Sequence, residues 1–268
     1  MTATTTTPQI KLKTVALPAE HGGWGFLFEP ILLGLLVAPS WAGLLIGLGM
    51  FAMFLTRHPL KMTVNDRKRG KRYARTALAE RFVLVYGVAI VFFLALALAL
   101  SRIEVFTPLA LAFPLMLIQL FYDLTNRSRS VLPELAGPVG LAAASSSIAL
   151  AGGWSLAAAL PLWVIIAARA VPSVLYVRAR LRLEHGKPTS SWPSLLAHLL
   201  GLLIVVGLAG LRIAPWLPVP VFVWLLGRAV WGLSSWRKSV PPKIIGFREL
   251  AYGLLVVVTT ALGYAFGI

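Results

Sequence analysis

Nine long apolar segments, separated by short polar connections, run through almost the whole chain. Each is close to the roughly 20 residues that an α-helix needs to cross the hydrocarbon core of a bilayer. The pattern predicts nine transmembrane helices, near residues 20–38, 41–59, 80–100, 105–122, 132–151, 154–176, 193–211, 214–233 and 247–267. We therefore expect an all-α protein, a polytopic membrane helical bundle.

The first residues of the chain differ from the rest. Residues 1–16 lack the apolar core of a signal peptide and are predicted to form a flexible cytosolic tail, followed by a single transmembrane helical domain at residues 17–268. The composition of the whole chain also indicates a membrane protein. A hydrophobic fraction of 58% and a mean hydropathy of +0.82 are too high, and too evenly spread, for a water-soluble fold of 268 residues.

The basic residues are distributed unevenly between the connections. If the tail is cytosolic, 23 of the 25 Lys and Arg residues fall on the cytosolic side, and only Arg102 and Arg212 lie opposite. The positive-inside rule then predicts that the N-terminus lies in the cytosol and the C-terminus outside. Because these charges lie beside apolar spans, the net charge of +16 indicates the lipid bilayer as a partner and not nucleic acid.

Several common kinds of site have no signal in the chain. The absence of Cys excludes disulfides, thiol catalysis and Cys-ligated metals. The four His have no metal-site spacing, and neither a phosphate-binding loop of Walker type nor a G-x-S-x-G elbow occurs. The residues alone therefore predict no metal and no cofactor.

Any functional opening should face the cytosol. Residues 57–81 are the only long polar run and carry nine of the 25 basic residues, whereas the connections on the opposite side are short and turn-like. Loops of a few residues are too short to build the mouth of a site on that opposite side.

Three charged residues, Glu29, Arg169 and Arg228, lie well inside predicted spans, where ionisable groups are costly and usually paired or functional. Counted along their helices, they reach a similar depth from the cytosolic side. We predict a polar cavity open to the cytosol, in which Glu29 neutralises one arginine and surplus positive charge attracts an anion. The alternative is an ion pair that only holds helices together. Helical spacing adds polar neighbours on the same faces: His21 beside Glu29, and Ser173, Tyr176 and Arg180 beside Arg169.

The stretch PAEHGGWG at residues 18–25, followed by Glu29-Pro30, resembles the EHGxW signature of the YwiC-like family of bacterial membrane proteins. The runs RHPLK at residues 57–61, RSVLPELAG at 129–137 and ARAVPSVLYVRARLRLEHG at 168–186 extend the resemblance over nearly the whole chain. It implies a multi-pass protein of the bacterial cell (inner) membrane and no particular activity.

A more distant resemblance is to the UbiA superfamily of intramembrane prenyltransferases. It rests on the predicted nine spans and on three matches to that superfamily's motifs: Asn65-Asp66 at the start of the first Asp-rich motif, Tyr122 with Arg127 and Pro133-Glu134 after the fourth span, and the loop after the sixth span that ends at Gly186-Lys187. The resemblance implies a UbiA-like fold, in which carboxylates hold Mg²⁺ against a prenyl diphosphate.

The Asp-rich motifs are degenerate in this chain. Arg69 and Tyr73 stand at the second and third Asp positions of the first motif. The region of the second motif offers several arginines and a single acid, Glu184. These replacements remove oxygen ligands and repel Mg²⁺.

We therefore expect a protein that binds an anionic amphiphile, such as a polyprenyl (di)phosphate or a quinone precursor, in the cytosol-facing cavity. Arginine forks match phosphate oxygens without a metal, and the apolar helices would accept the tail. The residues predicted to bind this ligand are Glu20, His21, Glu29, Arg57, Lys61, Asn65, Lys68, Arg72, Tyr122, Arg127, Arg169, Ser173, Tyr176, Arg180 and Arg228.

Three alternatives stay open. The protein could be an active UbiA-like prenyltransferase that uses Mg²⁺, with Asp66, Asp123, Glu134 or Glu184 as metal ligands or general base. It could be a transporter of an anion or metabolite, or an accessory membrane subunit, although the short outer loops count against a transport route. Finally, the basic residues could serve topology alone. The ligand's identity, the oligomeric state and protein partners are not predicted.

Overall fold

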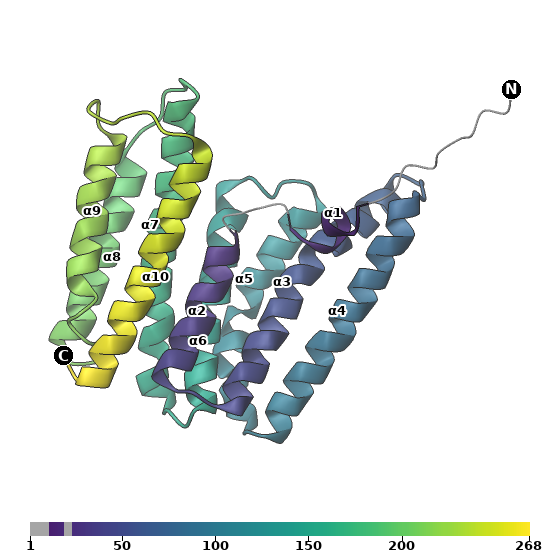
Figure 1. Ribbon diagram of the computed structural model, residues 1–268, viewed down its shortest axis with the longest axis horizontal. Helices are drawn as coiled ribbons and strands as arrows, with labels where there is room; N and C mark the ends of the chain where they lie inside the picture. Colours follow the sequence, from purple (N-terminus) through teal and green to yellow (C-terminus); the bar gives the residue numbers. More distant parts are fainter. Residues whose placement is uncertain (1–10, 19–22) are drawn as a thin grey trace, which may run out of the picture.

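The computed structural model describes residues 11–18 and 23–268, and within them every regular element is helical, which confirms the predicted all-α class. A short helix and one 3₁₀ turn accompany nine longer helices (Figure 1). In chain order they are α1 (Leu12–Ala16), α2 (Gly23–Val37), α3 (Trp41–Lys68), α4 (Ala74–Ala99), η1 (Ile103–Phe106), α5 (Thr107–Leu124), α6 (Val131–Ala151), α7 (Leu156–Glu184), α8 (Trp192–Gly210), α9 (Val219–Leu233) and α10 (Pro242–Phe266).

Each of the nine predicted spans coincides with one of the helices α2 to α10. Seven of these helices are long and apolar enough to cross a membrane, so the chain is a multi-pass membrane protein. The other two, α2 and α9, have 15 residues each. At 1.5 Å per residue a helix of that length spans about 22 Å, which is less than a hydrocarbon core of about 30 Å.

Two helices run further than the hydropathy pattern indicated. Helix α3 has 28 residues and includes the first part of the polar run, and α7 has 29 residues. Each continues until a glycine with positive φ stops it, Gly70 (φ 64°) after α3 and Gly186 (φ 68°) after α7. Polar residues therefore extend these helices beyond the apolar segments, because polarity alone does not end a helix.

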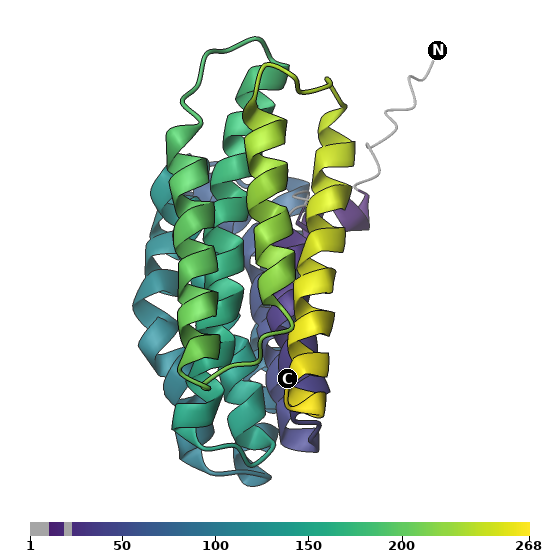
Figure 2. The same ribbon diagram turned by 90° about the vertical axis from the view of Figure 1, so that its left-hand side faces the viewer.

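The helices stand side by side in an elongated bundle (Figures 1 and 2). Helices α7 to α10 form one side of Figure 1 and α3 to α5 the other, with α2 and α6 between them. Although α2 is the first long helix of the chain, it packs against both α6 and α10. The earliest long helix thus joins the two sides of the bundle.

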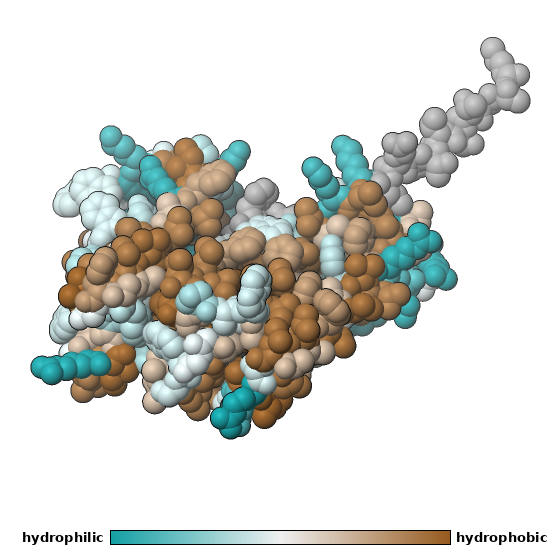
Figure 3. Space-filling model, turned by 60° about the horizontal axis from the view of Figure 1, so that its bottom comes forward, coloured by the Kyte–Doolittle hydropathy of each residue, from teal (hydrophilic) through white to brown (hydrophobic). Residues whose placement is uncertain are grey.

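Four connections that each contain Lys or Arg lie at one end of the bundle, the upper end in Figure 1, which we call the basic end. They are residues 69–73, 125–130, 185–191 and 234–241. The C-terminus lies at the opposite end. The sides of the bundle carry exposed apolar side chains, such as Val88 and Phe92 on α4 and Leu203 on α8, and Figure 3 shows such side chains covering most of one face, with hydrophilic ones at its margins. This distribution suits contact with a lipid bilayer.

Part of the predicted tail is folded. Residues 12–16 form α1, which packs against α3 and α4 with Val15 buried. The carbonyl of Ala16 accepts a hydrogen bond from the Tyr86 hydroxyl at 3.2 Å. Residues 1–10 lie outside the described part of the chain.

Candidate functional site

The centre of the bundle contains a buried ion pair between α2 and α7. Arg169 Nη1 lies 3.0 Å from Glu29 Oε1, and both side chains are at most 4% exposed. Neither carboxylate oxygen of Glu29 receives a well-directed hydrogen bond, so the contact is mainly electrostatic. Space for it comes from Gly253 on α10, where a Cβ atom would overlap the Glu29 carboxylate. Arg169 also donates a hydrogen bond to the backbone carbonyl of Glu249.

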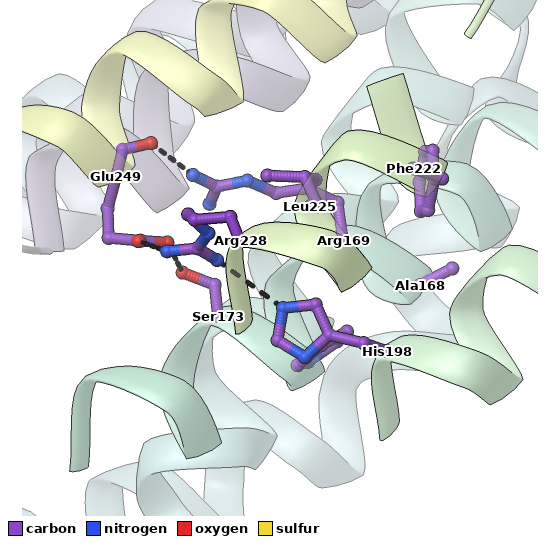
Figure 4. A pocket seen from close by; sticks show the side chains of 9 residues that line it. Ala168, Arg169, Ser173, His198, Phe222, Leu225, Arg228 and Glu249 are labelled. Carbon is purple, nitrogen blue, oxygen red and sulfur yellow. Dashed lines mark hydrogen bonds and ion pairs between the residues drawn. The ribbon is translucent and has the colours of Figure 1, made fainter. Parts of the chain in front are cut away.

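A second buried carboxylate, that of Glu249 on α10, lies next to this pair (Figure 4). Its Oε1 pairs with Arg228 of α9, and its Oε2 accepts a hydrogen bond from Ser173 of α7 at 2.6 Å. Arg228 Nη2 lies 3.3 Å from Nε2 of His198, whose Nδ1 faces the Ser194 carbonyl at 2.8 Å. Because a carbonyl can only accept, Nδ1 carries the proton and Nε2 is free to accept from Arg228. Helices α7, α8, α9 and α10 are thus joined by one polar network.

The predicted surplus of positive charge around the buried arginines is wrong. Each arginine of this region pairs with one carboxylate: Arg169 with Glu29, Arg228 with Glu249, and Arg180 with Glu184 at 2.7 Å. The prediction failed because it counted Glu29 as the single buried acid and overlooked Glu249 inside the last predicted span. The rule that flagged Glu29, an ionisable residue within an apolar segment, also applies to Glu249.

A small hollow lies within the polar network. Its volume is about 10 Å³, which is enough for about one water molecule and for nothing larger. Its lining consists of Ala168, Arg169, Pro172, Ser173, His198, Phe222, Leu225, Arg228 and Glu249 (Figure 4). This hollow cannot hold an amphiphile.

A second hollow, of about 660 Å³, lies between α7, α9 and α10, and we call it the α9–α10 pocket. This volume is within the range of ligand-binding pockets. Apolar and aromatic residues make much of its wall, including the exposed side chains of Val223, Trp224 and Trp231. Its full lining is Tyr176, Arg180, Val223, Trp224, Gly227, Arg228, Trp231, Gly232, Arg237, Lys238, Val240, Ile245, Arg248, Glu249 and Tyr252.

Five basic residues and one acid contribute to this lining. Arg180 is occupied structurally, because it donates to the backbone carbonyls of Gly232 and Lys238 and so ties down the connection between α9 and α10. Arg237, Lys238 and Arg248 form no ion pair with any acid in the described residues. We call these three residues the basic rim: Arg237 and Lys238 are in the connection at the basic end, and Arg248 is in the second turn of α10.

Four predicted ligand residues of α3 hold this helix to α5 and to the connection after it, and they line neither hollow. Their contacts are Arg57 with Asp123 at 2.8 Å, Lys61 with Ser128 at 2.7 Å, Asn65 with Asn126 at 2.8 and 3.1 Å, and Lys68 with the Leu124 carbonyl at 3.2 Å. The amide of Asn65 therefore does not orient a ligand beside Arg169 and Arg228.

The remaining predicted ligand residues are scattered. Arg72 pairs with Glu80 at 3.2 Å, and neither Tyr122 nor Arg127 lines a hollow. Glu20 and His21 lie outside the described residues. Of the predicted ligand residues that the structure describes, Arg169, Ser173, Tyr176, Arg180 and Arg228 are the ones that contribute to the lining of the two hollows.

The four acids predicted as possible metal ligands do not fit a Mg²⁺ site. Each pairs with an arginine: Asp66 with Arg75 at 3.1 Å, Asp123 with Arg57, Glu134 with Arg178, and Glu184 with Arg180. Asp66 also accepts from the Thr76 hydroxyl at 2.8 Å. Across residues 11–18 and 23–268, no three His, Asp or Glu side chains come together as a metal site would require.

Comparison with known proteins identifies the family. Residues 17–151, half of the chain, match the family described as YwiC-like protein. The chain belongs to the YwiC-like family. The uncharacterized protein YwiC of Bacillus subtilis (strain 168) is 23% identical over 243 residues, which cover 87% of this chain and 92% of that relative. No solved structure matches the chain, and the resemblance to the UbiA superfamily stays a prediction.

The YwiC-like match and the α9–α10 pocket concern different parts of the chain. The matched residues end with α6 and include Glu29, whereas every residue that lines the pocket comes later. The alignment with the Bacillus subtilis protein, covering 87% of the chain, necessarily includes many of the later residues.

Besides Glu249 and the apolar lining, sequence reasoning missed four polar residues of the pocket. The basic rim and Tyr252 were not among the predicted ligand residues, because the positive-inside rule already explained the charges after α9. The available signal was a cluster of Arg237, Lys238, Lys243 and Arg248 close to aromatic residues such as Trp231.

Proposed function

We propose that this YwiC-like protein binds an anionic amphiphile, such as a polyprenyl phosphate or diphosphate, in the α9–α10 pocket. The observation that supports this proposal is the combination of a hollow of about 660 Å³, a largely apolar and aromatic wall, and a rim of three cations that form no ion pair within the described residues. Ligand pockets commonly have apolar walls with a few convergent polar groups. Here the convergent groups are cationic, so the ligand's polar group is anionic.

The arrangement suits a ligand with one polar end. The basic rim lies toward the basic end of the bundle, where the positive-inside rule puts the cytosolic headgroup region of the bilayer. Trp224 and Trp231 of α9 lie along the apolar wall. An anionic headgroup at the rim would therefore leave its apolar tail beside aromatic and aliphatic side chains, in contact with the hydrocarbon core.

The strongest competing explanation is that the rim serves topology alone, because Lys and Arg near a span fix its orientation without binding anything. The test compares the wild type with a triple variant of the rim, Arg237→Gln, Lys238→Gln and Arg248→Gln. A matched control, Lys11→Gln, Lys13→Gln and Lys71→Gln, removes the same charge from residues of the basic side that line neither hollow. Each protein is purified from native membranes in mild detergent, and lipids that copurify are quantified by mass spectrometry.

If the pocket binds such a ligand, an acidic lipid should copurify with the wild type and with the control. The amount that copurifies with the rim variant should be lower by at least about tenfold, which corresponds to about 1.4 kcal/mol. Equal amounts of the same lipids in all three preparations would count against the proposal. Membrane insertion is followed in parallel by accessibility of engineered termini, since a topology role predicts altered insertion of the rim variant.

The prenyltransferase alternative has less support than binding without chemistry. A UbiA-like reaction needs carboxylates free to hold Mg²⁺, whereas each of the four candidate acids is paired with an arginine. No observation favours the transporter alternative over the binding function.

A further inference from the structure

Two cations of the basic rim, Arg237 and Lys238, belong to the connection between α9 and α10, residues 234–241, which contains neither helix nor strand. If this connection were loose in the free protein, a ligand would have to order it on binding. Such ordering costs free energy for the backbone and for each long side chain that is immobilised. The affinity of the α9–α10 pocket therefore depends on what holds this connection in place.

The connection is held from the side by Arg180 of α7. The Arg180 guanidinium donates from Nη1 to the backbone carbonyl of Gly232, in the last turn of α9, and from Nη2 to that of Lys238. Because the guanidinium is planar and rigid, these two bonds fix the end of α9 relative to the rim. The Arg180 side chain is only 4% exposed, so water has little access to compete for the two carbonyls.

Glu184 holds both Arg180 and the connection. It lies one turn after Arg180 on α7 and pairs with it at 2.7 Å, and the Glu184 side chain is 7% exposed. Its other carboxylate oxygen accepts a hydrogen bond from the Ser239 hydroxyl. Glu184 lines neither hollow, so it does not touch a ligand in the pocket. Its two contacts instead orient the guanidinium that binds the Lys238 carbonyl and anchor the residue that follows Lys238.

The proposed binding function, on which this step rests, requires rim cations that converge on one headgroup. We infer that Glu184 is a positioning residue, which acts through Arg180 and Ser239 to hold the basic rim in its binding arrangement before a ligand arrives. A site that takes its binding arrangement only part of the time loses affinity in the same proportion. Preorganisation of this kind strengthens binding without adding a contact to the ligand.

A positioning role and a purely electrostatic role of Glu184 have opposite consequences. As a negative charge beside the basic rim, Glu184 would weaken the binding of an anion, and its removal would strengthen binding. As a positioning residue it strengthens binding, and its removal weakens binding. Ser239 allows a test at constant charge, because Ser239→Ala removes only the hydroxyl that the Glu184 carboxylate holds.

The test measures the binding of farnesyl phosphate to the full-length protein in dodecyl maltoside by isothermal titration calorimetry at pH 7.5. Relative to the wild type, we expect binding to be about three- to tenfold weaker for Ser239→Ala and at least about tenfold weaker for Glu184→Ala. Ser239→Thr keeps a hydroxyl and should restore the wild-type affinity. Ser235→Ala is the matched control and should bind normally, because Ser235 is an exposed serine of the same connection that contacts neither Arg180 nor Glu184.

Hydrogen–deuterium exchange of the ligand-free proteins provides a second readout. We expect the backbone amides of the connection between α9 and α10 to exchange faster in Ser239→Ala and Glu184→Ala than in the wild type and in Ser235→Ala. Farnesyl phosphate should slow this exchange. A change confined to the connection distinguishes positioning from a general loss of stability, which would also speed exchange in the helices of the bundle.

The outcomes distinguish this inference from the proposed function. If Ser239→Ala binds farnesyl phosphate as tightly as the wild type, or if Glu184→Ala binds it more tightly, the positioning role is refuted while anionic-amphiphile binding stands. Glu184→Ala leaves Arg180 without its counter-ion, and if that variant does not fold, the comparison of Ser239→Ala with Ser239→Thr decides alone. If farnesyl phosphate does not bind the wild type, the proposed function itself fails.

Discussion

Glu29 of α2 and Arg169 of α7 form an ion pair of 3.0 Å with both side chains almost completely buried. Removing one partner of such a pair leaves a buried charge without compensation, which typically costs about 3–5 kcal/mol. We predict that Arg169→Gln and Glu29→Gln each lower the thermal unfolding temperature strongly. The double variant should be more stable than either single one, and a double-mutant cycle by differential scanning fluorimetry measures the coupling. If the effects of the two substitutions were additive, an interaction between Glu29 and Arg169 would be contradicted.

Gly253 provides a second test of the same pair. A methyl group there would overlap the Glu29 carboxylate, so Gly253→Ala should destabilise the protein by about 1–3 kcal/mol through overpacking. Gly246→Ala on the same helix is the matched control, because nothing lies within 4 Å of its added Cβ. The control should be neutral or slightly stabilising, since alanine favours a helix over glycine.

A larger side chain at a glycine of its wall should partly fill the α9–α10 pocket. Gly227 lines the pocket, and nothing lies within 4 Å of an added Cβ. Gly227→Leu should therefore keep the fold and weaken farnesyl phosphate binding by at least about tenfold, which corresponds to 1.4 kcal/mol. Gly207→Leu on α8 adds the same side chain at an open position outside the pocket and should bind normally. Unchanged affinity of Gly227→Leu, measured by calorimetry, would point to another site.

A substitution at Asp66 tests whether the protein only binds its ligand or also catalyses a metal-dependent reaction. Its carboxylate pairs with Arg75, which is 46% exposed, and accepts from the Thr76 hydroxyl. Asp66→Asn should cost about 1–3 kcal/mol, because the Asp66 side chain is only 2% exposed and its hydrogen bonds are weakened or lost. Farnesyl phosphate binding should not change with this variant or with EDTA. Metal-dependent turnover of a labelled prenyl diphosphate, lost in Asp66→Asn, would instead establish the transferase alternative.

Much of the fold could be predicted because its determinants are local. Apolar segments near the length of a bilayer crossing all became helices, and helical spacing correctly grouped Arg169, Ser173, Tyr176 and Arg180, which are all buried. Glu29 was correctly assigned to one of the two arginines, because ionisable groups inside spans are usually paired.

The site itself depends on which helices are neighbours, and sequence alone did not provide this. The contact of Glu249 with Arg228 and Ser173 requires α7, α9 and α10 to meet at matching heights. The basic rim carried no separate signal, because the positive-inside rule accounts for lysines and arginines whether or not they line a pocket. Asn65 and Asp66 matched a motif, but their side chains contact Asn126, Arg75 and Thr76.

The central position of α2 has a consequence for biosynthesis. Its carboxylate at position 29 meets the guanidinium at position 169, which leaves the ribosome 140 residues later, and α2 gains its contact with α10 only when the last helix arrives. At a synthesis rate of about 5–20 residues per second, about 7–28 s pass between the synthesis of Glu29 and that of Arg169. A chain that stops before residue 169 therefore lacks the cation that compensates this acid, and an uncompensated acid inside a span is costly.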